Sequence, residues 1–289
     1  MDDPRTRESG DHQKRGTILF SIRNLSKIFY VSPDEGPAGS GKNTGSGGNA
    51  GSGEIRAVSG ISLEIHEGEC LIIAGSNGSG KTLLTRMLAG LLDCSGGEIL
   101  FRGKPLGKAA GELRRQVGLV FQDADAQIIG ETVEEDTAFG PKNLGLPKPE
   151  VEERVRNALA VLGLSDKRNF PPRRLSGGEK RRLAVAGIVA MGCETVMMDE
   201  PFANLDWPGV IQVLEIIRDL RGSGKTVIIL THELEKVLAF ADRLVILDRG
   251  MIRDEGPPRE VLDRLKPEYG VRDPRRNYAR VEDCTWLGP

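Results

Sequence analysis

The stretch Gly75-Ser-Asn-Gly-Ser-Gly-Lys-Thr82 constrains the fold of this chain more than any other part of it. It matches the phosphate-binding pattern G-x-x-x-x-G-K-[ST], with an apolar run at 70–74 before it and an amphipathic run from Leu83 after it. A chance Gly/Ser turn that contains Lys-Thr seldom has both neighbours, so we expect a strand that leads in and a helix that leads out. The sequence therefore predicts a cradle for a nucleoside triphosphate.

The glycines of this cradle allow backbone conformations that are closed to residues with a Cβ, so that successive N–H groups can turn toward phosphate oxygens. The following helix adds unpaired N–H groups and the positive end of its dipole. In this pattern Lys81 reaches the β- and γ-phosphates, and the Thr82 hydroxyl binds Mg²⁺. The residues expected to contact ATP here are Gly75, Ser76, Asn77, Gly78, Ser79, Gly80, Lys81, Thr82 and Leu83.

A near-copy of the pattern, Gly36-Pro-Ala-Gly-Ser-Gly-Lys-Asn43, lies upstream. It has Asn43 where the pattern needs the hydroxyl that binds Mg²⁺, and neither an apolar strand nor an apolar helix flanks it. We interpret it as a consequence of the Gly/Ser-rich composition of its surroundings.

The overall composition allows a sizeable core and gives no sign of a polyanionic partner. The 289 residues suffice for one large α/β domain or two small ones, and 38% of them are hydrophobic. The formal net charge is only −2, and no polybasic tract is present. We therefore expect no nucleic-acid partner and no direct binding to anionic lipid.

The cysteines and the N-terminal residues predict a reducing compartment. Cys70, Cys94, Cys193 and Cys284 are far apart and form no C-x-x-C pair, so we expect free thiols rather than a zinc site or disulfides. Residues 1–15 are polar and charged, unlike a signal peptide, and no apolar run approaches the ~18 residues that span a bilayer. The expected location is the cytoplasm, with any membrane attachment made through another protein.

Apolar patterning predicts an α/β fold with a helical insertion. Helical segments broken by prolines occupy 123–174, most clearly at 151–162. Beyond them, helices and strands alternate, which predicts a mostly parallel sheet covered by helices. The predicted helices are 179–191, 210–220, 234–240 and 259–265, and the predicted strands are 17–22, 26–31, 61–66, 70–74, 98–102, 117–121, 195–198, 226–230 and 244–247.

Three segments have little apolar content and are expected to lie outside the packed core. They are a disordered tail at 1–16, a flexible Gly/Ser-rich loop at 32–53 and a weakly patterned C-terminal extension at 266–289.

A second nucleotide signal is Val196-Met-Met-Asp-Glu-Pro201, an apolar strand that ends in two carboxylates. Ligands at the carboxyl end of a parallel strand face the crevice where phosphates bind. We expect Asp199 to hold Mg²⁺, through water, and Glu200 to accept a proton from the water that attacks the γ-phosphate. Without the upstream cradle, the same residues would be an ordinary acidic turn.

Leu175-Ser-Gly-Gly-Glu179, between the two nucleotide motifs, resembles the signature of ATP-binding cassette (ABC) ATPases. Alone, Ser-Gly-Gly could be a helix-entry turn capped by Ser176. The order of the three motifs makes the resemblance specific, and it extends over about 17–265. It implies a P-loop NTPase cassette of the α/β class, with a RecA-like core, an antiparallel β subdomain and an inserted helical subdomain that includes the signature, at about 123–182.

The resemblance also implies roles for residues outside these motifs. Gln122, at a strand end, resembles the glutamine that senses Mg²⁺ and the attacking water. Ala203-Asn-Leu-Asp206 resembles the D-loop, which crosses between two subunits. His232 resembles the switch histidine that contacts the γ-phosphate, and Tyr30 resembles the aromatic residue that stacks on adenine. Without the resemblance, a lone histidine after a strand is usually structural, and a tyrosine in a strand is commonly part of the core.

In this family two cassettes pack head to tail, and the signature of one closes over ATP held by the other. The resemblance therefore implies that Ser176, Gly177 and Gly178 contact the γ-phosphate in trans. One departure is Leu83, which replaces a common hydroxyl residue and offers no hydrogen bond to the α-phosphate. One neutral hydrogen bond is worth on the order of 1 kcal/mol, so we expect at most a modest loss of affinity.

The segment from Gln122 to Leu146, with its Thr132-Val-Glu-Glu-Asp136 and Phe139-Gly-Pro141 runs, resembles the ATPases of energy-coupling factor (ECF) importers for cobalt, nickel and vitamins. The resemblance implies ATP hydrolysis coupled to uptake, a second ATPase subunit that is identical or a paralogue, an integral membrane scaffold bound through 122–146, and a substrate-binding membrane subunit. The alternatives are another ABC importer or exporter, and a soluble ABC protein of DNA repair or translation. The single cassette, without a long heptad region or zinc-type cysteine pairs, argues against the soluble class.

Overall fold

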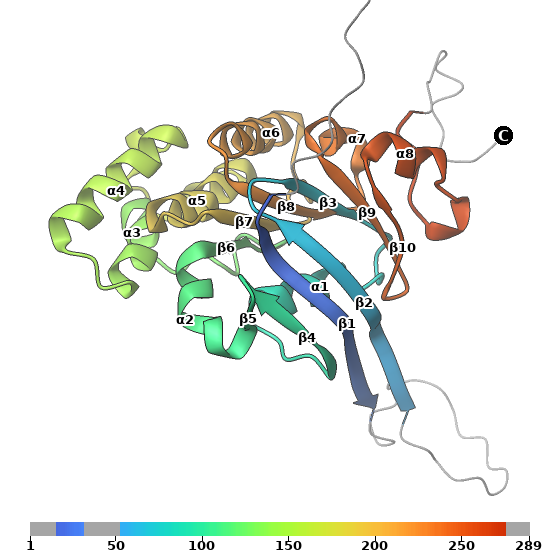
Figure 1. The fold of residues 1–289 in the computed structure, drawn as a ribbon. Coiled ribbons are helices and arrows are strands. Elements are labelled where there is room, and N and C mark those ends of the chain that lie inside the picture. Colours follow the sequence, from blue (N-terminus) through green and yellow to red (C-terminus); the bar gives the residue numbers. More distant parts are fainter. Residues whose placement is uncertain (1–15, 32–52, 276–289) are drawn as a thin grey trace, which may run out of the picture.

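The computed structural model describes residues 16–31 and 53–275, which form two β-sheets with helices around them (Figure 1). The tail at 1–15, the loop at 32–52 with its near-copy of the cradle, and residues 276–289 lie outside the described residues. The larger sheet has the strand order β10-β9-β3-β8-β7-β6. Its strands are β3 (Cys70–Ala74), β6 (Val117–Val120), β7 (Thr195–Asp199), β8 (Thr226–Thr231), β9 (Arg243–Asp248) and β10 (Met251–Gly256).

The larger sheet is parallel except for its edge strand. The pairs β3–β8, β3–β9, β6–β7 and β7–β8 are parallel, whereas β10 runs antiparallel to β9. Strands β3, β7 and β8 are buried along their whole length, as their continuous apolar sequences predict for parallel strands covered on both faces. The prediction of a mostly parallel sheet is confirmed.

The smaller sheet is antiparallel, in the order β2-β1-β4-β5. It consists of β1 (Ile18–Val31), β2 (Gly53–His66), β4 (Gly96–Phe101) and β5 (Lys104–Pro105). The sequence predicted two short strands where the structure has the single strand β1. The polar pair at 23–24 marks a bulge instead of a break, because Asn24 takes the left-handed conformation (φ 50°), which asparagine tolerates.

Helices cover both faces of the parallel sheet. They are α1 (Lys81–Leu88), α2 (Leu106–Gln116), α3 (Val133–Asn143), α4 (Lys148–Val161), α5 (Gly177–Met191), α6 (Trp207–Gly222), α7 (Leu234–Val237) and α8 (Pro258–Asp263), with short 3₁₀ turns at Ser165–Lys167, Pro172–Arg174, Leu238–Phe240 and Pro267–Tyr269. Helix α1 and the antiparallel sheet cover one face, and α5 to α8 cover the other (Figure 1). Helices α3 and α4 pack on α5 as the helical subdomain.

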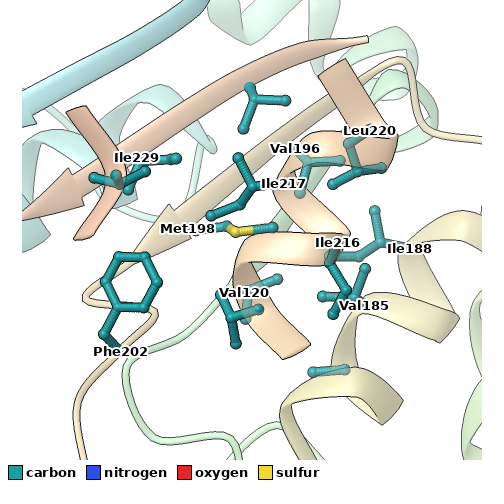
Figure 2. Close-up of a cluster of buried hydrophobic side chains, with 14 of the residues drawn as sticks. Val120, Val185, Ile188, Val196, Met198, Phe202, Ile216, Ile217, Leu220 and Ile229 are labelled. Carbon is teal, nitrogen blue, oxygen red and sulfur yellow. The ribbon is translucent and has the colours of Figure 1, made fainter. Parts of the chain in front are cut away.

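Two hydrophobic cores follow from the alternation of side chains along the strands. On β7, for example, Val196 and Met198 point into the core beneath α5 and α6, whereas Met197 points into the core beneath α1. Figure 2 shows the first of these cores, where Met198 lies among side chains of α5, α6 and β6. This continuous packing holds the carboxyl end of β7 in a fixed place.

The chain beyond α8 returns to the body of the molecule. Val271 is buried in the core beneath α5 to α8, and Gly270 lies beside the cradle, where a Cβ on it would come 3.1 Å from Cβ of Ser76. This stretch was expected to lie outside the packed core, because a single buried valine leaves no periodic pattern in the sequence.

Candidate functional site

The predicted cradle joins β3 to α1 at the carboxyl end of the parallel sheet. Gly78 and Gly80 have φ values of 81° and 101°, which only glycine adopts without strain. Gly75 serves a different purpose from the one predicted. A Cβ on Gly75 would lie 2.3 Å from the carbonyl oxygen of Leu247 on β9. Glycine is therefore needed here because the cradle backbone passes close to β9.

Lys81 is buried at the first turn of α1, and its ammonium group contacts the cradle backbone. Its Nζ donates to the carbonyl oxygens of Gly75 at 2.7 Å and Ser76 at 3.1 Å. The same Nζ lies 3.1 Å from Oε1 of Glu200, and both side chains are only 6% exposed. A buried cation is thus placed between the cradle and the acidic end of β7.

Glu200 lies one residue beyond β7 in a strained conformation. Its φ of 47° is uncommon for a residue with a Cβ, and such strain is often found at functional sites. While Oε1 contacts Lys81, Oε2 lies 2.9 Å from Nδ1 of His232, which follows β8. The structure therefore brings Lys81 together with Glu200, more than a hundred residues later in the sequence, and with His232, a further 32 residues on.

Asp199 and Thr82 provide oxygen ligands of the kind that Mg²⁺ prefers. Burial raises the pKa of Asp199 above its usual 3.8; the Thr82 hydrogen bond and the Lys81 charge lower it, and the Glu200 charge adds to the rise. Asp199 Oδ1 is buried with no hydrogen-bond partner. An unpartnered carboxylate oxygen beside a hydroxyl suits a small, hard cation.

Among the described residues, no three His, Cys, Asp or Glu side chains gather in a way that could hold a metal ion. Mg²⁺ in phosphate sites is usually bound by one or two protein groups together with phosphate oxygens and water. Thr82 and Asp199 fit such a site.

A cavity of about 600 Å³ lies beside these two residues, and several predicted site residues line it. Gln122 is exposed at its wall, directly after Phe121. Of the three signature residues, Gly177 alone lines the cavity. The lining residues are Thr82, Arg86, Phe121, Gln122, Asp123, Ala124, Asp125, Ala126, Gly177, Arg181, Asp199, Ala203 and Asn204.

The signature forms the first turn of α5. Ser176 caps the helix in a capping box: its hydroxyl accepts from the N–H of Glu179, and the Glu179 carboxylate accepts from the N–H of Ser176. Burial would raise the pKa of Glu179, but bonds from Lys167 and from the Ser176 N–H lower it overall. Ser176 and Gly177 are exposed, whereas Gly178 is buried against α6. Ser176 can therefore cap α5 and still be exposed as part of the signature.

Tyr30 is not among the residues that line the cavity. It lies near the end of β1, opposite Glu54 of β2, and its side chain is 74% exposed. Its ring is open to a flat ligand.

Sequence reasoning missed Arg181 at this site. Its side chain is buried and lines the cavity with Gln122 and Asp199. The available signal was the run Lys180-Arg181-Arg182 on a helix that packs against the sheet, where one cation had to point inward.

Comparison with known proteins decides the family. The family model described as ABC transporter matches residues 58–203, about half of the chain. The chain is also 43% identical over 222 residues to a putative ABC transporter ATP-binding protein of Halobacterium salinarum, covering 77% of this chain and 95% of the relative. The chain belongs to the ABC transporter family. The predicted fold and the resemblance to ABC ATPases are both confirmed.

Other relatives within the ABC family have more specific names. The energy-coupling factor transporter ATP-binding protein EcfA of Methanocaldococcus jannaschii is 45% identical over 206 residues, which cover 70% of this chain and 74% of the relative. The cobalt import ATP-binding protein CbiO of Rhodobacter capsulatus is 44% identical over 227 residues, which cover 77% and 81%.

Solved ABC structures agree with the fold. The structure of cbiO1 from Clostridium perfringens, described as part of the ABC transporter complex cbiONQ, matches with a TM-score of 0.70 and 31% identity, covering 86% of this chain and 91% of that one. A dimeric, post-hydrolysis ATP-binding cassette bound to ADP and Pi matches with a TM-score of 0.69 at 22% identity, covering 83% and 99%. The second likeness concerns the fold alone.

Proposed function

We propose that this chain is the ATP-hydrolysing subunit of an ECF-type importer for a vitamin or a transition-metal ion, bound to the cytoplasmic face of the membrane. The contact of Glu200 with both Lys81 and His232 carries the hydrolytic part of the proposal. The relatives named EcfA and CbiO, together with the segment at 122–146, support the importer subtype. No helix at 16–31 or 53–275 is long and apolar enough to cross a membrane, so the proposal includes separate membrane subunits.

In the proposed reaction, four side chains near the cradle contact ATP or the attacking water. Lys81 binds the β- and γ-phosphates from within the cradle, next to Glu200. Glu200 accepts a proton from the attacking water, and His232, which contacts its second carboxylate oxygen, orients it and binds the γ-phosphate. Gln122 at the cavity wall positions the water. Thr82 and Asp199 would hold Mg²⁺, which neutralises charge on the phosphates.

The proposed active form is a head-to-tail dimer of two ATPase subunits, identical or paralogous. Ser176 and Gly177 are exposed at the start of α5, where backbone N–H groups and the helix dipole favour an anion. We propose that these two residues and Gly178 complete the ATP site of the second subunit.

We further propose that the membrane scaffold binds the helical subdomain. A cavity of about 670 Å³ lies between the loop before α3 and the turn at Pro172–Arg174, lined by Ile128, Gly130, Thr132 and Pro171 among others. Ile129 and Phe170 expose 59% and 44% of their surface. Exposed apolar residues next to a hollow suit a helix of a membrane subunit, and five of the nine residues that line the hollow belong to the segment that resembles ECF ATPases. A substrate-binding membrane subunit would join through the scaffold.

Affinity purification from detergent-solubilised native membranes tests this function. The expected result is recovery of a multi-helix membrane subunit with the ATPase, and ATP-dependent uptake of a vitamin or metal ion by vesicles made from the complex. Ile129→Asp is expected to lose the membrane subunit and keep the ATPase activity of the isolated chain. Recovery with ribosomes or nucleic acid would contradict the proposal, and uptake of another substrate class would favour a different ABC importer.

A further inference from the structure

Arg181 has an unusual position for a charged residue of this chain. It lies on α5, one helical turn after Gly177, and only 4% of the residue is exposed. Burial lowers the pKa of Arg181, which the charge of Asp123 partly offsets, and its Nε has no hydrogen-bond partner. Because a buried charge costs more free energy than an apolar side chain of similar size, a residue of this kind usually has a specific task.

The guanidinium group of Arg181 joins two loops that lead to the proposed ATP site. Its Nη1 donates to the carbonyl oxygen of Phe121 at 2.7 Å, and its Nη2 donates to that of Ala203 at 3.3 Å. Phe121 directly precedes Gln122. Ala203 begins the D-loop, and its N–H donates to the carbonyl oxygen of Glu200 at 3.2 Å. One planar group therefore contacts the loop of the water-positioning glutamine and the turn of the general base.

Helix α5 is held firmly to the strand that leads to this contact. A Cβ on Gly118 of β6 would lie 2.3 Å from Cγ2 of Ile188, so the helix and the strand touch without space between them. A movement of the loop after β6 is therefore expected to move α5 with it, since closely packed elements shift as units. The opposite end of α5 carries the signature.

We propose that Arg181 is a positioning residue that couples the loops at Gln122 and Glu200 to the signature end of α5. Through this contact, ATP in the cradle of one subunit sets the position of the signature that the same subunit offers to its partner. The inference rests on the proposed ATPase dimer. If Arg181 links the two ATP sites, its replacement should weaken the coupling between the sites without loss of nucleotide binding.

Arg181→Met tests the coupling, since methionine fills the buried space and donates no hydrogen bond. We expect monomer affinity for a fluorescent ATP analogue to stay within about twofold, because the two hydrogen bonds of Arg181 go to Phe121 and Ala203, outside the cradle. The Hill coefficient of ATP hydrolysis should fall toward one and kcat should drop about tenfold, a size typical of coupling between sites. In a Glu200→Gln background, the ATP concentration that produces the dimer should rise by a similar factor. Arg181→Lys, which can reach one carbonyl, should recover part of each effect.

Arg154→Met is the matched control. Arg154 of α4 donates to the carbonyl oxygens of Ala190 and Met191, at the end of α5 away from the signature. The Arg154→Met variant loses the same kind of arginine–carbonyl contact to the same helix. It should therefore affect the thermal unfolding midpoint more than the Hill coefficient. A folded Arg181→Met protein with unchanged Hill coefficient and kcat would overturn the inference, as would an equal loss of cooperativity in Arg154→Met. Absence of ATP hydrolysis in the wild-type chain would instead overturn the proposed function.

Discussion

Lys81 Nζ lies 3.1 Å from Glu200 Oε1, and neither side chain has more than 6% of its surface in contact with solvent. The cation that is proposed to bind the phosphates and the carboxylate proposed to activate water are thus already in contact. ATP must share or replace this ion pair when it binds. The other carboxylate oxygen contacts His232, so a phosphate that enters the cradle affects all three groups at once.

Glu200→Gln is expected to separate nucleotide binding from turnover. The amide keeps the shape of the side chain and accepts no proton, so kcat should fall by ~10²–10⁴, the usual contribution of a general base. ATP affinity should be maintained or increased, because Lys81 no longer has a carboxylate competitor. Size-exclusion chromatography with ATP should show a stable dimer. Hydrolysis at the wild-type rate would show that Glu200 is not the base.

Asp199→Asn is expected to abolish ATP hydrolysis and to change the pH dependence of stability. Burial raises the pKa of Asp199 above 3.8, so the ionised form disfavours the folded state of the nucleotide-free protein at neutral pH. As pH falls through the raised pKa toward 3.8, the folded state takes up a proton and this cost disappears. The variant should therefore be more stable than the wild type at pH 7, and the difference should shrink toward pH 4.

Urea unfolding of both proteins between pH 7 and pH 4 measures this difference. ATPase assays over a range of Mg²⁺ concentrations complete the test, because Asp199→Asn should lose hydrolysis at every Mg²⁺ level. A stability difference that grows on acidification would show that the raised pKa has been assigned to the wrong group.

Tyr30→Ala is expected to weaken ATP binding. Stacking of a base on an aromatic ring contributes about 1–3 kcal/mol, which corresponds to a rise in Kd of roughly 5- to 150-fold. Phe29 offers a matched control, because it directly precedes Tyr30 in β1, faces the other side of the sheet and has Lys27 Nζ 5.3 Å from its ring centroid. Titration with a fluorescent ATP analogue should show a higher Kd for Tyr30→Ala and an unchanged one for Phe29→Ala. Equal effects would indicate that the strand as a whole had been disturbed.

Motif residues with their own local context were predictable from the sequence. Gly78, Gly80 and Lys81 lie in one loop, and the strand before it and the helix after it could be read from apolar patterning. The fold class followed from the same patterning. The sequence did not show which distant residues come into contact, because contacts such as that of Lys81 with Glu200 depend on the order of strands in the sheet. The family resemblance supplied the proposed roles of Gln122 and His232, which pattern alone would have left as structural residues.

Residues whose importance comes from close packing could not be predicted. Gly118 has an ordinary φ and no motif around it, yet its missing side chain is what allows α5 to approach β6. Arg181 stood in a run of three cations, and only the position of the helix shows which of them is buried. The extent of β1 and β2 was underestimated, because bulges interrupt the alternation on which strand prediction depends.

Replacement of residues 32–52 by Asn-Gly is expected to leave the ATPase nearly unchanged. Val31 of β1 pairs with Gly53 of β2, so the two strand ends are already adjacent, and Asn-Gly forms the two-residue turn that best joins antiparallel strands. ATP hydrolysis and its KM should stay within about twofold, since hairpins with two-residue loops keep the register of their strands. A large loss of activity would show that the segment is more than a connection, and an unchanged thermal midpoint would exclude misfolding as the cause.

Gly118→Ala tests the close contact between β6 and α5. The new Cβ would lie 2.3 Å from Cγ2 of Ile188, and no backbone strain contributes because the φ of Gly118 is not positive. Overpacking of this kind costs about 1–3 kcal/mol of unfolding free energy. Gly111→Ala in α2 is the matched control, because its Cβ would meet open space and alanine favours helix by about 1 kcal/mol. Urea unfolding should therefore show opposite changes for the two variants. Ile188→Ala should restore part of the stability of Gly118→Ala in a double-mutant cycle, and strict additivity of the two changes would show that the helix and the strand are not in direct contact.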